Sequence, residues 1–173
     1  MNYLKNLNNN KSNIFICVGM PLTGKTTYAN NIKNNLHDTI VINKFDIYEK
    51  YISYKKQLTT EDFNFFENIK YSILNTAIKF NKNIVIDDCN LYPKKLEFLI
   101  NNIFLNINKD IYDVYIIDFT DIDYDIIFSK NKELDKYNVL TIPMLYSNID
   151  EIKTTIENIK SSYNIKILKY EYE

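Results

Sequence analysis

The chain has 173 residues, of which 46% are hydrophobic and 25% charged, and its formal net charge is −1. These proportions fit one globular domain with a sizeable core. No apolar run approaches the roughly 20 residues of a transmembrane helix, so we expect no membrane partner, and the net charge excludes bulk electrostatic attraction to nucleic acid. Two cysteines, Cys17 and Cys89, form neither a disulfide framework nor a metal set, which favours a reducing, cytoplasmic compartment.

The first predicted elements flank a glycine-containing loop. Residues 1–12 are interpreted as a polar, flexible arm that lacks the apolar block of a signal peptide, and residues 13–173 as a single domain. Residues 14–18 form a continuous apolar run that predicts a buried parallel strand, and residues 26–36 predict a helix. The intervening segment fits the pattern G-x-x-x-x-G-K-[ST] and reads Gly19-Met20-Pro21-Leu22-Thr23-Gly24-Lys25-Thr26.

This loop predicts a binding site for nucleotide phosphates. The backbone N–H groups of such a loop surround phosphate oxygens, and the helix N-terminus adds its dipole. Lys25 is expected to contact the β- and γ-phosphates, and Thr26, with Thr27 as a partial substitute, to ligate Mg²⁺. The chain has only two glycines, Gly19 and Gly24, and both stand where a side chain would collide with a phosphate. We therefore predict that the loop binds ATP and Mg²⁺.

The second predicted strand, residues 39–43, is followed by an acidic residue of interest. Asp46 stands just past this strand, at the edge of a parallel sheet where ligands bind. A carboxylate there can accept the proton of an attacking hydroxyl, so Asp46 is a candidate catalytic base, with a helix N-cap as the alternative. Residues 59–80 then predict a helix that begins with Thr59 and Asp62 in a capping arrangement. The apolar residues at helical spacing in it are Phe63, Phe66, Ile69, Ile73, Ala77 and Phe80.

A pair of acids ends the third predicted strand, residues 83–87. Asp87 and Asp88 follow four strand-type residues, which is the form of a strand that supplies a magnesium-organising carboxylate. Since side chains alternate faces along a strand, one acid can face the metal and the other a substrate. The alternative is that one or both acids cap the following turn.

The rest of the chain continues the alternation of helices and strands. A helix over 94–106 follows Pro93 at a first helical position. Further predicted elements are a strand over 113–119, helices over 122–132 and 143–161, and an edge or half-exposed strand over 165–170. This order predicts a three-layer α/β/α P-loop NTPase fold with a mostly parallel sheet of about five strands, right-handed crossovers and a helical lid.

Together these motifs resemble the bacteriophage-type polynucleotide 5′-kinases. The resemblance is carried by the loop, by Asn43-Lys44-Phe45-Asp46, by Asp88-Cys89-Asn90-Leu91 with the following Pro93, and by Val139-Leu140-Thr141-Ile142-Pro143. It implies transfer of the γ-phosphate of ATP to a 5′-hydroxyl end of RNA or DNA. It also implies roles for the following residues: catalysis by Asp46, Lys25 and Lys130; donor binding by Lys130 and Lys132; acceptor binding by Asp46, Lys50, Asp88, Cys89 and Asn90; and metal binding by Thr26, Asp87 and Asp88.

The sequence departs from this family at its arginines. All 21 of its Lys+Arg residues are lysines. Glu49 occupies the place of the arginine that holds the acceptor phosphate, and Lys50 follows it. Lys130 and Lys132, with Lys136, stand in place of a lid arginine. Because lysine supplies charge without a planar fork, it is no equivalent replacement.

Three functions therefore remain open. The first is a polynucleotide 5′-kinase, the second a small-molecule kinase acting on a nucleoside, sugar or other metabolite, and the third a non-catalytic module that binds ATP. Labelling of an oligonucleotide, labelling of a metabolite, or ATP binding without turnover would distinguish them.

Overall fold

A five-stranded parallel sheet forms the centre of the protein. The computed structural model describes residues 7, 10–52, 59–132 and 145–170. The strands are β1 (Ser12–Gly19), β2 (Thr39–Asn43), β3 (Asn83–Asp87), β4 (Tyr112–Phe119) and β5 (Ile165–Lys169). They lie in the order β2-β3-β1-β4-β5 and every neighbouring pair is parallel. The predicted parallel sheet of five strands is confirmed, and β1 lies at its centre.

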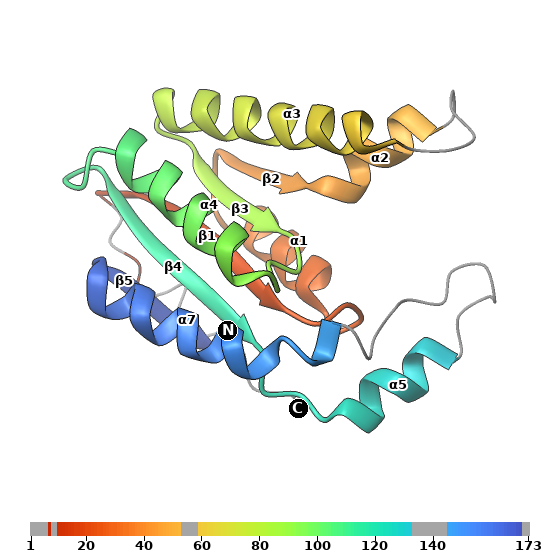
Figure 1. Ribbon diagram of the computed structural model, residues 1–173. Coiled ribbons are helices and arrows are strands. Elements are labelled where there is room, and N and C mark those ends of the chain that lie inside the picture. The colour runs from red at the N-terminus through yellow and green to blue at the C-terminus, as the bar shows by residue number, and fades with distance from the viewer. Residues whose placement is uncertain (1–6, 8–9, 53–58, 133–144, 171–173) are drawn as a thin grey trace.

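Helices cover both faces of this sheet (Figure 1). They are α1 (Lys25–Asn35), α2 (Lys44–Ile52), α3 (Thr60–Lys79), α4 (Pro93–Asn106), α5 (Tyr124–Lys132) and α7 (Ile149–Ser162). Residues of α3, α4 and α7 pack on one face of β1 beside Ile14 and Ile16, whereas residues of α1 pack on the other beside Phe15 and Cys17. Strand residues that are apolar in succession can therefore all be buried, which confirms the three-layer α/β/α arrangement.

The structure differs from the predicted elements mainly around α2 and α3. Helix α2 was considered only as the alternative in which Asp46 caps a helix. The helix begins earlier, at Lys44, and Asp46 lies within its first turn. The signal for this start is Asn43, whose Oδ1 accepts a hydrogen bond from Phe45 N at 2.8 Å. The capping box of α3 at Thr59 and Asp62 is confirmed.

The apolar face expected for α3 is only partly right. The buried positions of α3 are Asp62, Phe66, Lys70, Leu74, Ala77 and Ile78. Phe63, Ile73 and Phe80 are exposed. The buried face of α3 is therefore rotated relative to the apolar face that the sequence predicts. It carries two charged residues, Asp62 and Lys70.

Near the C-terminus the described chain has a short helical turn at 145–146 before α7 begins at Ile149. Pro143, the segment 139–143, Lys136 and most of the arm 1–12 lie outside the described residues, so the predictions made for them stay predictions. No helix in the described ranges has both the length and the apolar character needed to cross a bilayer.

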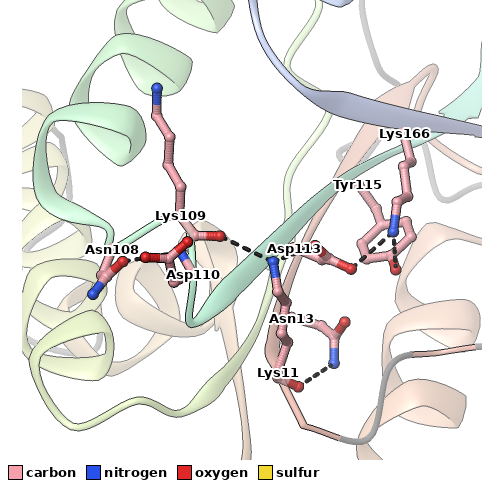
Figure 2. A network of polar contacts seen from close by, with 8 residues as sticks. All are labelled: Lys11, Asn13, Asn108, Lys109, Asp110, Asp113, Tyr115 and Lys166. Carbon is pink, nitrogen blue, oxygen red and sulfur yellow. Dashed lines mark hydrogen bonds and ion pairs between the residues drawn. The ribbon is translucent and has the colours of Figure 1, made fainter.

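A charged network joins the strands at the end of the sheet where β4 begins (Figure 2). Asp113 pairs with Lys166 of β5 at 2.8 Å and with Lys11 at 3.4 Å. Lys166 Nζ also donates to Tyr115 Oη at 3.3 Å. Partial burial acts to raise the pKa of Asp113, but the hydrogen bonds from the two lysines outweigh it and hold that pKa below its usual range. This network ties the edge strand to the sheet, at the opposite end of β4 from the loop of residues 19–26.

Candidate functional site

The two glycines of the loop between β1 and α1 are required for different reasons. Gly24 has φ 87° and is the N-cap of α1, and a Cβ there would meet nothing within 4 Å. Its backbone conformation is the left-handed one that glycine adopts without strain. A Cβ on Gly19 would instead lie 2.5 Å from Phe119 Cβ. The sequence predicts phosphate clearance at both positions, whereas at Gly19 the packing of β1 against β4 already excludes a side chain.

Lys25 is held within the loop by the loop's own oxygens. Its Nζ donates to Met20 O and lies 3.4 Å from Thr23 Oγ1, while Thr23 Oγ1 donates to Met20 O at 2.8 Å. The lysine is 7% exposed. Leu22 has φ 66°, a conformation that is strained for a leucine and often found at ligand-binding loops. The loop therefore presents a buried positive charge at the N-terminus of α1.

The two acids at the end of β3 face different partners. Asp87 is 3% exposed and its Oδ2 accepts from Asn43 Nδ2 at 2.6 Å. Asp88 pairs through Oδ2 with Lys70 of α3 at 3.0 Å, and its Oδ1 accepts from Cys89 N at 2.8 Å. Because β3 lies between β1 and β2, both carboxylates stand beside the loop.

Cys89 and Asn90 fasten the end of β3 to the loop strand. Gly19 N donates to Cys89 O at 3.0 Å, and Asn90 Nδ2 donates to Cys17 O at 2.8 Å. Asn90 adopts the left-handed conformation with φ 50°. Burial raises the pKa of the Cys89 thiol despite the nearby Lys25, so the sulfur is protonated at neutral pH. These contacts position the site, whichever ligand it binds.

A cavity of about 320 Å³ joins the loop to both acids. Its lining is Pro21, Leu22, Gly24, Lys25, Thr26, Thr27, Asn43, Phe45, Asp87, Asp88 and Cys89. Another hollow of about 360 Å³ lies between β2 and α3, but it is lined mainly by apolar groups such as Ile40, Ile73 and Phe80. We take the cavity at the loop as the candidate site, because it alone of the two combines a buried cation with carboxylates.

Several predicted site residues lie elsewhere among the described residues. Asp46 is exposed in the first turn of α2 and does not line the cavity, whereas its neighbour Phe45 does. Lys50 is exposed in the last turn of the same helix. Lys130 and Lys132 are exposed in the last turn of α5, which lies beyond the end of β4 (Figure 1). Three contributors were missed: Asn43, Phe45 and Lys70. Asn43 and Phe45 stand in the motif Asn43-Lys44-Phe45-Asp46, in which only Asp46 was given a role. The signal for Lys70 is that it stands four residues from both Phe66 and Leu74 on the buried face.

Comparison with known proteins identifies the fold. No protein-family model and no curated protein matches the chain. Among solved structures, a chain of the Pnkp1/Rnl/Hen1 RNA repair complex is similar with a TM-score of 0.65 at 18% identity, over 92% of this chain and 48% of that one. A fungal RNA kinase gives a TM-score of 0.57 at 16% identity, over 95% of this chain and 76% of that one. The fold is the three-layer α/β/α P-loop NTPase fold.

The similarity extends beyond these two structures and is limited in length. A chain of the PezAT toxin–antitoxin system of Streptococcus pneumoniae gives a TM-score of 0.61 at 10% identity, over 98% of this chain and 73% of that one. The present chain spans about half the length of the matched chain from the RNA repair complex. At these identities the comparisons establish the P-loop NTPase fold, and the chemistry has to be argued from the site.

Proposed function

We propose that this protein is an ATP-dependent phosphotransferase that phosphorylates the 5′-hydroxyl end of a polynucleotide. One observation carries the proposal: Lys25, Asp87 and Asp88 line a single cavity at the N-terminus of α1. A buried ammonium and a helix N-terminus favour the triphosphate of a nucleotide. Carboxylates beside it favour the divalent cation that accompanies such a triphosphate.

Thr26 and Asp87 are the residues that would hold Mg²⁺. Hydroxyl and carboxylate oxygens are the ligands that this cation prefers, and both residues line the cavity. Asp87 suits the role better than Asp88, because hydrogen bonds are found for both oxygens of Asp88 but only for Oδ2 of Asp87 among the described residues. When bound, Mg²⁺ neutralises charge on the β- and γ-phosphates.

The transfer forms one P–O bond and breaks another. The acceptor's hydroxyl oxygen attacks the γ-phosphorus, the bond to the β-phosphate oxygen breaks, ADP leaves with that electron pair, and the hydroxyl proton passes to a carboxylate. Lys25 stabilises the charge on the transferred group. Two carboxylates are candidates for the proton: Asp46, by its position after β2, and Asp88, which lines the cavity. Lys130 and Lys132 are proposed to approach the γ-phosphate through movement of α5.

The polynucleotide acceptor is supported by the motif order and by the fold shared with the RNA repair chain and the fungal RNA kinase. One observation favours a small-molecule acceptor without a phosphate of its own. Glu49 is exposed on α2 where an arginine would hold the acceptor phosphate, and its charge would repel that phosphate.

The test is to incubate the protein with γ-labelled ATP, Mg²⁺ and a mixture of 5′-hydroxyl oligonucleotides, nucleosides and sugars. The proposal expects label on the oligonucleotides. Lys25→Ala should abolish transfer, whereas Lys33→Ala, an exposed lysine in the last turn of α1, should not. Label on a metabolite alone would overturn the polynucleotide acceptor, and ATP binding without any labelled product would overturn the kinase.

The proton acceptor is identified by comparing Asp46→Asn with Asp88→Asn. The variant that lacks the base should lose turnover, by roughly 10²- to 10⁴-fold, while its ATP affinity is retained. Full turnover in Asp46→Asn would reject Asp46 as the base.

A further inference from the structure

A continuous group of aromatic rings extends from the cavity across α2 and α3. We name it the aromatic strip; it comprises Phe45, Tyr48, Tyr51, Phe63, Phe65 and Phe66. The ring centroids of Phe45 and Tyr48 are 5.9 Å apart, as are those of Tyr48 and Phe63. These distances are typical of aromatic pairs in contact, so the rings support one another as a semi-rigid surface.

The aromatic strip is anchored at one side and exposed at the other. Phe66 is fully buried and its ring lies 4.4 Å from that of Tyr48. Phe45, Phe63 and Phe65 are 58%, 43% and 48% exposed. A single exposed phenylalanine needs no explanation, but Phe45 and Phe63 are joined through Tyr48, and exposed rings in contact mark a place where a ligand or partner binds. Among the described residues, Phe65 joins this group only through the buried Phe66.

The aromatic strip is continuous with the candidate site through Phe45. This ring lines the same cavity as Lys25 and Asp88. A planar group that stacks on Phe45 would therefore place its attached hydroxyl near the carboxylates and the phosphate loop. The nucleotide at the end of an acceptor strand has this form, because a flat base and the 5′-hydroxyl belong to the same unit.

We propose that the aromatic strip binds the first bases of a single-stranded acceptor by stacking, with the terminal base on Phe45. This inference rests on the proposed function and defines the acceptor as a single strand. Base–aromatic stacking needs no particular sequence, since every base has a π-face. The exposed rings of Phe45 and Phe63, with Tyr48 between them, offer room for more than one base, which favours a polymer over a metabolite.

Charge around the aromatic strip also favours stacking over phosphate contacts. Lys44 is ion-paired with Glu67 at 2.7 Å. Although partial burial opposes its charge, the hydrogen bond to Glu67 raises the pKa of Lys44. Asp46, Glu49 and Lys50 are exposed on the same helix as Phe45, so the exposed acids outnumber the exposed base on α2. Acceptor binding should accordingly depend only weakly on salt, because few counterions are released when few phosphates are contacted.

The experiment measures the KM for a 5′-hydroxyl oligonucleotide and the KM for ATP in the full chain. Phe45→Leu keeps an apolar side chain and removes the π-face. The matched control is Phe80→Leu, an exposed ring at the opposite end of α3. Phe45→Leu should raise the oligonucleotide KM by roughly 5- to 150-fold and change the KM for ATP far less. Phe80→Leu should alter neither.

An oligonucleotide with an abasic 5′-terminal nucleotide tests the partner of Phe45. For the wild-type protein, the KM for this oligonucleotide should exceed the KM for the normal one by a similar factor. For Phe45→Leu, the two KM values should be equal. If oligonucleotides are labelled but Phe45→Leu behaves like Phe80→Leu, stacking is rejected and the proposed function stands. If only metabolites are labelled, the polynucleotide acceptor is rejected and the stacking inference with it.

Discussion

Replacing Lys70 by methionine should destabilise the fold through the charge it leaves behind on Asp88. The two side chains are 6% and 19% exposed, and Nζ lies 3.0 Å from Oδ2. At an effective dielectric constant of about 20, unit charges at this distance attract by about 5 kcal/mol before desolvation is subtracted. Breaking a buried pair from one side typically costs about 3–5 kcal/mol. Because Asp88 keeps the hydrogen bond from Cys89 N and borders the cavity, we expect about 2–4 kcal/mol for Lys70→Met.

Urea unfolding followed by circular dichroism measures this loss. In the Asp88→Asn background the same Lys70→Met change should cost at least about 1 kcal/mol less, since no buried carboxylate is stranded. The control is Lys82→Met, whose partner Asp38 is 75% exposed and whose loss should cost about 1 kcal/mol or less. If Lys70→Met costs the same with and without the Asp88 carboxylate, the ion pair contributes nothing and the reasoning is refuted.

Three further predictions concern stability. Gly19→Ala should cost more in unfolding free energy than Gly24→Ala, about 2–4 against about 1 kcal/mol, because only the first places a Cβ 2.5 Å from β4; equal costs would contradict the packing argument. Asp113→Asn should destabilise the protein at neutral pH, and the difference should shrink as the pH falls from about 5 toward 2. The folded pKa of Asp113 is lowered, so its ion pairs stabilise the fold above the unfolded pKa of about 3.9 and are lost as the pH falls through the folded value; a difference independent of pH would argue against those pairs. Thr59→Ala should cost about 1 kcal/mol through loss of the capping box, whereas Thr154→Ala on an exposed helix face should cost less, as thermal unfolding would show.

The sequence by itself determined the elements that depend on local patterns. Continuous apolar runs predicted the first four strands, because strands buried on both faces leave no polar alternation. The alternating residues 165–170 predicted the fifth as an edge or half-exposed strand, and β5 does lie at the edge of the sheet. The loop motif located Lys25 at a helix N-terminus, since its glycines and the following helix belong to one stretch of chain. The capping box at Thr59 was readable for the same reason. The start of helix α2 was not predicted because the only strong signal for it is Asn43, three residues before Asp46.

Only the tertiary structure decided which side chains share the cavity. The orientation of α3 about its axis places Lys70 against Asp88. The orientation of α2 places Phe45, rather than Asp46, in the wall of the cavity. The close packing of β4 against β1 explains why residue 19 has to be a glycine. Each of these outcomes depends on how two elements far apart in sequence pack against each other. A periodic pattern defines the apolar side of a helix to within about one residue, and one residue turns a side chain by about 100° about the helix axis.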